Sequence, residues 1–394
     1  MEKIYLDYAA TTPVDEKVEK AMRPYFSASF GNAGSLHSFG RDAVTAIDSA
    51  RDAVAQKIGA DFRDVIFTGS ATEANNLALR GIIKALGFRQ LGAGRLEPSG
   101  LAPKILVSSI EHESVLETAR DLSAEGVEIV VLPVDGKGLV DLEKLESSLD
   151  ERTVLVSVMY ANNEIGTIQP VAEISKIIKK FDYKILFHTD AVQAFQYLDC
   201  NVNMLGVDFL TLSAHKIYGP KGVGALFARN TDSTPLNPVI TGGGQEFGLR
   251  SGTENVPSIV GFAKTVEITA EAREKEKKRV GKLRGHFWRE LKKIYPAVEI
   301  NGIIDGNSTL PNILNICFPG YRAEELLIKF DEAGIAVSAG SACQSRSAKP
   351  SHVLQALGFS EERARSSIRF SFGRLTEERE IKEALKLAAG ILKK

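Results

Sequence analysis

The chain has 394 residues, which is too many for one ordinary hydrophobic core and predicts two domains. Its 49 basic and 50 acidic residues nearly cancel, so charge gives no argument for a nucleic-acid or membrane partner. No apolar run has the length of a membrane span, and the first residues lack the apolar core of a signal peptide. We therefore expect a soluble, cytoplasmic protein.

Short apolar runs alternate with helical patterns through most of the first 260 residues. The apolar runs have strand character and lie at residues 65–67, 105–107, 154–158, 185–187 and 209–212. Helical patterns follow three of them, at residues 71–86, 114–124 and 171–180. Continuous apolar strands separated by helices predict an α/β fold with a mostly parallel sheet covered on both faces. Ligands bind such sheets beyond the carboxyl ends of the strands.

The highly charged stretch at 270–279 indicates an exposed part of a long helix that links two lobes. Strand-like runs separated by helices follow it and predict a smaller α+β domain; they lie at 298–300, 313–318, 335–337 and 368–372. We expect a large domain over residues 15–262 and a small domain built from 1–14 and 263–394. Residues 87–103 have no clear period and predict a surface insertion.

A histidine and a lysine, His215 and Lys216, come just after the apolar run at 209–212 and before a turn rich in Gly and Pro. A lysine at the end of a buried strand can be desolvated, which lowers the pKa of its amine and frees it for Schiff-base chemistry. The alternative is a solvated lysine beside a core histidine. The other motifs of the chain have to decide between these two interpretations.

The segment 68–75, Thr-Gly-Ser-Ala-Thr-Glu-Ala-Asn, joins the end of a strand to the start of a helix. Backbone N–H groups and the helix dipole face such a turn, which makes it a natural cradle for a phosphate, with the Ser70 and Thr72 hydroxyls as further donors. The alternative is ordinary capping of the helix by Ser or Thr.

Asp190 follows a buried strand, where an unpaired carboxylate is costly. A protonated ring nitrogen of a heteroaromatic cofactor would pair with it, as the pyridinium of pyridoxal 5′-phosphate (PLP) does, whereas the alternative is a helix N-cap. Asp190, the His215–Lys216 pair and the turn at 69–72 together match a ring nitrogen, an aldehyde carbon and a phosphate. Jointly they predict PLP.

The chain resembles the cysteine desulfurases, PLP enzymes of class V and fold type I, nearly from end to end. That resemblance implies a large domain with a mostly parallel seven-stranded sheet and a smaller α+β domain. The segments that carry it are 5–12, 68–73, 111–112, 162–166, 190–193, 213–216, 250–253, 338–343 and 366–371.

The resemblance implies a role for each matching residue around the cofactor. Lys216 would form the Schiff base with PLP and later shuttle the substrate α-proton, and Asp190 would pair with the ring nitrogen. Gln193 would donate to the phenolate oxygen, and His112 would stack on the ring and act as an acid or base. The phosphate would be held by Ala71, Thr72, Ser213 and His215.

Substrate binding and assembly are implied in the same way. Asn163, also a cofactor contact, and Arg369 would bind the substrate carboxylate, Arg369 as a bidentate fork. Thr253 resembles a residue that reaches the phosphate of the neighbouring subunit, so a homodimer with shared sites is implied. Without the family, His112 would be interpreted as a polar residue at a strand-to-helix junction and Arg369 as part of a surface ion pair.

Cys343 lies in a small and polar segment, 338–350, that we expect to be a mobile loop because it buries little apolar surface. A thiol there is interpreted as a nucleophile that travels, and the alternative is an incidental exposed cysteine. Cys317 lies in an apolar run and is expected to pack in the core, while Cys200 has no evident role. The Gly-Ser-Ala-Cys form and the long loop resemble group I desulfurases, which feed iron–sulfur cluster assembly and tRNA thiolation.

The implied reaction converts L-cysteine to L-alanine and leaves the sulfur as a persulfide on Cys343, from which an acceptor protein such as an iron–sulfur scaffold takes it. No resident metal is expected; a cluster shared transiently between Cys343 and that scaffold is implied by analogy only. The alternatives are a selenocysteine lyase, a class V aminotransferase, or a catalytically idle sulfur-relay scaffold. The idle scaffold predicts a missing lysine or ring partner, but Lys216 and Asp190 are both present.

Overall fold

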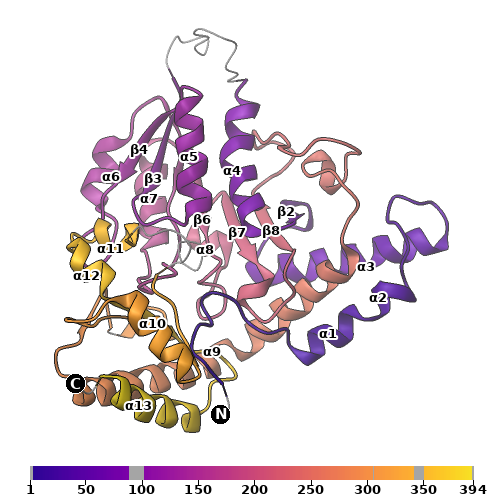
Figure 1. Ribbon diagram of the computed structural model, residues 1–394. Coiled ribbons are helices and arrows are strands. Elements are labelled where there is room, and N and C mark those ends of the chain that lie inside the picture. The colour runs from indigo at the N-terminus through magenta and orange to yellow at the C-terminus, as the bar shows by residue number, and fades with distance from the viewer. Residues whose placement is uncertain (1–2, 88–101, 305, 341–349, 393–394) are drawn as a thin grey trace.

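The computed structural model describes residues 3–87, 102–304, 306–340 and 350–392 (Figure 1). A seven-stranded sheet of order β2-β8-β7-β6-β5-β3-β4 lies at its centre. These strands are β2 (Val65–Thr68), β3 (Lys104–Ser108), β4 (Glu128–Leu132), β5 (Thr153–Ser157), β6 (Leu186–Asp190), β7 (Phe209–Ser213) and β8 (Gly224–Ala228). Neighbours from β4 to β7 run parallel, whereas β8 runs antiparallel to β7 and to β2. The predicted mostly parallel sheet is confirmed.

Helices cover both faces of this sheet, which is why its strands are apolar without alternation. In β3, Ile105 and Val107 pack in one buried cluster, together with residues of α4 (Ala71–Ala85) and α5 (Glu113–Ala124). Leu106, between them, packs in the cluster on the other face, beneath α3 (Ser38–Ile58) and α7 (Val171–Phe181). Shorter helices of this domain are α1 (Glu16–Met22), α2 (Pro24–Ser27), α6 (Leu142–Ser148) and α8 (Val202–Leu205).

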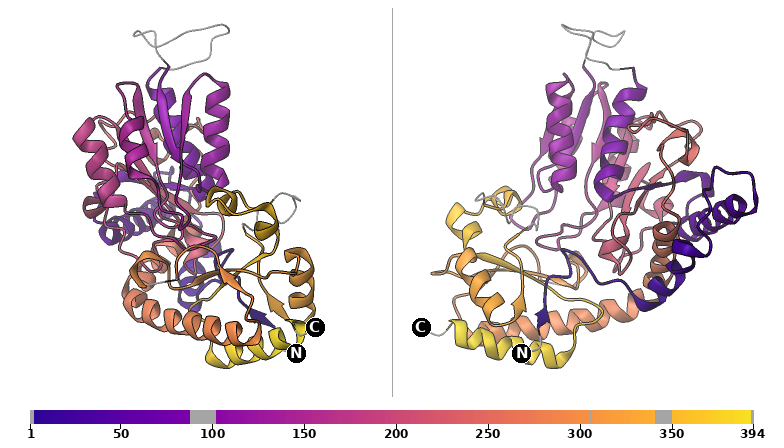
Figure 2. Two further views of the ribbon diagram at one scale, coloured as in Figure 1. Left: turned by 90° about the vertical axis from the view of Figure 1, so that its left-hand side faces the viewer. Right: turned by 45° about the vertical axis from the view of Figure 1, so that its right-hand side comes forward.

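A second, smaller unit carries a three-stranded antiparallel sheet, β12-β10-β9, and a two-stranded parallel sheet, β1-β11. Its strands are β1 (Ile4–Tyr5), β9 (Glu299–Ile300), β10 (Ile313–Cys317), β11 (Ile335–Ala336) and β12 (Ser367–Ser371). Its helices are α10 (Ala323–Glu332), α11 (His352–Ala356), α12 (Glu361–Arg365) and α13 (Glu378–Leu392). The first strand of the chain thus pairs within this unit, and both termini lie beside it (Figure 2).

The long helix α9 (Val256–Ile294) connects the two units (Figure 1). It packs on α1 and α3 near its start and on α13 near its end, and its middle contains the charged stretch 270–279. The helix runs without a break through the boundary predicted at residue 262. No helix in the described ranges is both long and apolar enough to cross a membrane.

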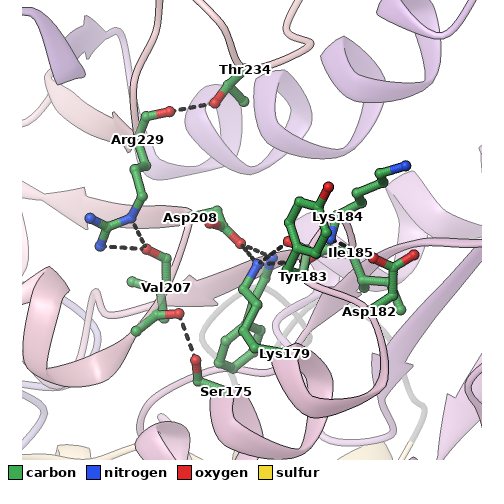
Figure 3. Close-up of polar contacts among 12 residues, drawn as sticks. Ser175, Lys179, Asp182, Tyr183, Lys184, Ile185, Val207, Asp208, Arg229 and Thr234 are labelled. Carbon is green, nitrogen blue, oxygen red and sulfur yellow. Dashed lines mark hydrogen bonds and ion pairs between the residues drawn. The ribbon is translucent and has the colours of Figure 1, made fainter.

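Polar contacts fix the amino ends of the central strands, at the edge of the sheet opposite their carboxyl ends (Figure 3). The ammonium of Lys179, on α7, donates to Oδ2 of Asp208 and to the carbonyl of Ile185, both at 2.7 Å. The same Asp208 oxygen accepts from the backbone N–H of Phe187 in β6 at 2.8 Å. Arg229 donates from Nε to the carbonyl of Val207, just before β7, at 3.1 Å. These contacts hold β6 and β7 in place from one side, while their other ends carry polar side chains.

Candidate active site

A cavity of about 230 Å³ lies beyond the carboxyl ends of the central strands. Residues from both units line it, including Ala9 and Ala10 near the N-terminus and Arg369 on β12. It brings together most of the residues predicted from the sequence: Ala71, Thr72, His112, Asn163, Asp190, Gln193, Ser213, His215, Lys216 and Arg369. Thr253 is exposed and lies outside the cavity lining, in the loop before α9. Cys343 lies outside the described residues, as does most of the insertion predicted at 87–103.

The predicted phosphate cradle is the turn between β2 and α4. Ser70 caps the helix, and its hydroxyl accepts from the N–H of Glu73 at 3.1 Å, while the Glu73 carboxylate accepts from the N–H of Gly69 at 2.9 Å. The capping alternative is therefore present, yet a helix N-terminus still presents first-turn N–H groups to the cavity. Gly224 of β8 packs behind this turn, where a Cβ would lie 2.8 Å from the carbonyl carbon of Ser70 and 2.9 Å from the nitrogen of Ala71. Only glycine fits there.

Asp190 ends β6 and is held by two donors of the protein. Its Oδ1 accepts from the N–H of Val192 at 3.0 Å, and its Oδ2 accepts from Nδ2 of Asn75 at 2.9 Å. Asn75 lies on α4, one turn after the cradle, and is completely buried. The sequence pattern did not single out Asn75, because its partner is 115 positions away.

Lys216 lies on the short turn that follows β7, and the segment near the N-terminus covers it. Its Nζ donates to the carbonyls of Ala9 and Ala10 at 2.8 and 2.7 Å. Nδ1 of the neighbouring His215 lies 3.1 Å from the hydroxyl of Thr11. Burial lowers the pKa of His215 to about 4, assisted by the charges of Lys216 and Lys221, so this ring is neutral at physiological pH.

His112 caps α5 with its ring. Its Nδ1 accepts from the N–H of Ser114 at 3.1 Å and lies 2.8 Å from the Ser114 hydroxyl. Burial lowers the pKa of His112, although the charge of Asp190 acts in the opposite direction. The residue before it, Glu111, is completely buried; its Oε1 accepts from the Ser108 hydroxyl at 2.5 Å and from the Met159 N–H at 2.7 Å. Burial raises the pKa of Glu111 to about 8.

Arg369 is only 1% exposed and reaches the cavity from β12. It donates from Nη2 to the Asp7 carboxylate and from Nη1 to the carbonyl of Asn163, each at 2.8 Å. An ion pair is therefore present, but it is buried at the cavity rather than displayed on the surface. Nη1 and Nη2 each use one hydrogen in these two bonds, so further N–H donors of the guanidinium remain at the cavity that Arg369 lines. The sequence pattern did not indicate Asp7.

The two described cysteines are poor nucleophiles. Cys200 and Cys317 are both buried, and burial raises the pKa of Cys200 to about 12 and also raises that of Cys317. Neither lines the cavity. The described residues just after the segment that holds Cys343 contact the direct neighbours of the lining residues Asn163 and His112. Ser351 donates to the carboxylate of the buried Glu164 at 2.5 Å, and Nε2 of His352 lies 3.0 Å from the carbonyl of Glu111.

The donor set of the cavity fits PLP. The helix N-terminus at Ala71 suits the phosphate, and the oriented carboxylate of Asp190 suits the protonated ring nitrogen. Lys216 supplies an amine for the aldehyde. The guanidinium of Arg369, which lines the cavity, fits the carboxylate of an amino-acid substrate.

Known proteins resemble this chain over its whole length. The family model described as aminotransferase class-V matches residues 4–384. A protein named cysteine desulfurase IscS, from Dictyoglomus turgidum, is 44% identical over 392 residues, which cover 100% of this chain and 95% of that protein. One named putative cysteine desulfurase IscS 1, from Bacillus subtilis, is 43% identical over 395 residues and all of both chains.

Solved structures are also similar to this chain over nearly its whole length. One titled NifS-like protein superposes with a TM-score of 0.89 at 37% identity and covers 99% of both chains. Another, titled SspA in complex with cysteine, superposes with a TM-score of 0.79 at 35% identity and covers 94% of this chain and 98% of that one.

Proposed function

The chain belongs to the class V aminotransferase family, and we propose that within it the protein acts as a PLP-dependent cysteine desulfurase that converts L-cysteine to L-alanine. One observation carries the proposal. A single cavity brings a lysine amine, an oriented carboxylate, a helix N-terminus and a buried arginine together, in a chain whose relatives carry that name. The structure titled SspA in complex with cysteine supports the choice of substrate.

Each side of the cavity would hold a different part of PLP. Ala71, Thr72, Ser213 and His215 would bind the phosphate, and Asp190 would pair with the ring nitrogen. Gln193 would donate to the phenolate oxygen; its Nε2 now donates to the carbonyl of Ala9 at 3.0 Å. His112 and Asn163 would contact the ring. When bound, the cofactor supplies an electron sink for the charge that develops at the substrate Cα.

The side chains of the protein bind the substrate and move its protons. Arg369 and Asn163 would orient the substrate carboxylate, which places the α-hydrogen toward Lys216. The Lys216 amine would take that proton and later return one to the carbon skeleton. Its present acceptors, the carbonyls of Ala9 and Ala10, belong to the segment over the site and keep Nζ inside the cavity wall.

Sulfur transfer would belong to Cys343. Its thiolate attacks the sulfur of the substrate, a new S–S bond forms, and the C–S bond breaks with its electron pair left on carbon. The carbon takes up protons and departs as alanine, while the sulfur stays as a persulfide for an acceptor protein. The raised pKa values of Cys200 and Cys317 argue against both as the nucleophile, and the contacts of Ser351 and His352, the described residues just after this segment, support the assignment. Iron–sulfur cluster assembly and tRNA thiolation are the proposed destinations of the sulfur.

A homodimer would complete the site through Thr253. Large apolar side chains are exposed before and at the start of α3, namely Phe26, Phe30, Leu36 and Phe39. Others are exposed in the loop that leads to Thr253, namely Val239, Ile240 and Phe247. The backbone segments that carry both groups, α2 to the start of α3 and the loop before α9, lie on the side of the large unit away from the small one (Figure 1). Exposed apolar surface of this kind marks an interface, and a second copy there would bring its own Thr253 toward the cradle.

The test is to incubate the protein with L-cysteine and a reductant and to measure alanine and sulfide in parallel. We expect equal amounts of both, and loss of both in Cys343→Ala. Cys317→Ala, which removes a buried thiol, is the matched control and should retain turnover. Normal turnover in Cys343→Ala would rule out this nucleophile and favour a selenocysteine lyase, and a requirement for a keto acid would favour an aminotransferase. Absence of a reducible PLP adduct on Lys216 would refute the cofactor assignment.

A further inference from the structure

A chain of hydrogen bonds joins the two residues between which the cofactor ring is proposed to lie. It runs from Asp190 through Asn75 and Ser114 to the ring of His112. From it we infer that Asn75 and Ser114 are positioning residues that hold the neutral His112 ring with its proton on Nε2. The role of His112 in the reaction rests on the proposed function, whereas the hydrogen-bond arrangement does not.

The direction of the first bonds follows from Asp190. An ionised carboxylate can only accept, so its partner on Asn75 has to be the amide nitrogen. That Nδ2 lies 2.9 Å from Oδ2 of Asp190 and 2.8 Å from Oγ of Ser114. The two hydrogens of the amide serve these two acceptors. The flipped amide would place Oδ1 against the carboxylate, which brings two acceptors together.

The direction of the remaining bonds follows from Ser114. Its hydroxyl accepts from Asn75, and its own proton is then free to point at Nδ1 of His112, 2.8 Å away. The backbone N–H of Ser114 is a second donor to the same Nδ1, at 3.1 Å. A ring nitrogen that receives two donors carries no proton, so the hydrogen of the neutral imidazole lies on Nε2.

Burial makes this network costly to disturb. Asn75 is 0% exposed and Ser114 is 8% exposed, so water does not replace a lost partner. Within the described residues Oδ1 of Asn75 is buried without a hydrogen-bond partner. An apolar side chain of similar shape would avoid that unsatisfied oxygen, so the value of an asparagine here lies in the two donors of its Nδ2.

It follows that His112 and Lys216 have different roles in proton transfer. His112 enters the reaction as an N–H donor from Nε2, and it cannot accept a proton on Nδ1 while both Ser114 donors point there. The removal of the substrate α-proton is therefore assigned to Lys216. Through the same chain Asn75 keeps a donor on Asp190, which orients the carboxylate that would pair with the ring nitrogen.

The experiment is nitrogen NMR of the PLP-loaded full chain labelled with ¹⁵N on histidine, which resolves 6 histidines. The His112 signals are assigned by their loss in His112→Gln. At pH 7.5 we expect the pattern of a neutral ring with Nδ1 unprotonated in the wild type and in Ser114→Thr, which keeps the hydroxyl. In Ser114→Ala we expect the Nδ1 signal to move toward a mixture of tautomers. A protonated Nδ1 in the wild type, or an unchanged signal in Ser114→Ala, would overturn the inference.

A second measurement tests Asn75 itself. Asn75→Asp replaces the donors with acceptors at the same size, and we expect it to weaken PLP binding by roughly 10- to 100-fold and to change the cofactor absorption spectrum. Asn237→Asp is the control, because this exposed asparagine donates from Nδ2 to the carbonyl of Lys84 at the far end of α4; it should bind PLP as the wild type does. Equal PLP binding and spectra in both variants would overturn the role of Asn75. If the network signals appear as expected but no alanine forms from cysteine, the proposed function fails while this arrangement stands.

Discussion

Replacing Gly224 with alanine tests whether the turn beneath the proposed phosphate site is held by close packing. The new Cβ would lie 2.8 Å from the carbonyl oxygen of Leu212, 2.8 Å from the carbonyl carbon of Ser70 and 2.9 Å from the nitrogen of Ala71. Ordinary contacts begin at 3.4 Å, and all three neighbours are backbone atoms that no rotamer change can move. The turn and strand β8 must therefore separate by about half an ångström.

Forced separations of this kind cost about 1–3 kcal/mol of folding free energy. The displaced turn also carries the first N–H groups of α4, so we expect the PLP dissociation constant to rise roughly tenfold, which corresponds to about 1.4 kcal/mol. Denaturant unfolding of the cofactor-free protein and titration with PLP measure the two effects separately.

Gly390→Ala is the matched control for this substitution. Gly390 lies near the end of α13 with open space around its missing side chain, so alanine should add about 0.4–1 kcal/mol of stability there and leave PLP binding unchanged. If Gly224→Ala has the unfolding free energy and the PLP dissociation constant of the wild type, close packing against Gly224 does not hold the turn in place.

Three further predictions concern other parts of the molecule. Asp208→Asn should lower the unfolding free energy by about 1–2 kcal/mol, because it weakens the bonds to Lys179 and Phe187. It should not change PLP binding, and Asp232→Asn, in an exposed ion pair, should have little effect on either quantity. Burial raises the pKa of Glu111 to about 8, above its ordinary value of 4.5, so the folded protein loses stability as pH rises between these values. Glu111→Gln should remove that loss. Urea unfolding at pH 5.5 and 8.5 measures the change in unfolding free energy with pH, and an equal change in both proteins would contradict the assignment. Arg369→Lys should lower kcat/KM for L-cysteine roughly 10- to 100-fold, mainly through KM, because the lysine cannot form the fork; steady-state kinetics with an unchanged KM would argue against a carboxylate contact.

Much of the fold could be predicted because its strands are buried on both faces. The run predicted at 209–212 is β7 (Phe209–Ser213), and the helix predicted at 71–86 is α4 (Ala71–Ala85). The prediction did not include β4 (Glu128–Leu132), whose residues are mostly part-exposed at the edge of the sheet and give a weaker apolar signal. It also did not include the antiparallel β8 (Gly224–Ala228), which follows the glycine-rich turn after Lys216.

Some residues of the candidate site could likewise be predicted from the sequence, and others could not. Lys216 and Asp190 could be found from sequence because each lies at the end of a buried apolar strand, where a charged side chain needs a partner. Asn75, Asp7 and Glu111 could not be assigned roles, because their value depends on partners brought close by folding. The bond from Asn75 to Asp190 spans 115 positions, and that from Asp7 to Arg369 spans 362.

The contact between the two ends of the chain has a consequence for biosynthesis. Asp7 pairs with Arg369, and the N–H of Ala9 donates to the Ser371 hydroxyl at 2.9 Å, so one wall of the cavity joins segments that lie 362 positions apart in the sequence. Domains begin to fold while the ribosome is still at work, but this wall cannot form until β12 has left the exit tunnel. A chain that lacks β12 therefore has no complete pocket, and we expect it to bind vitamin B6 poorly.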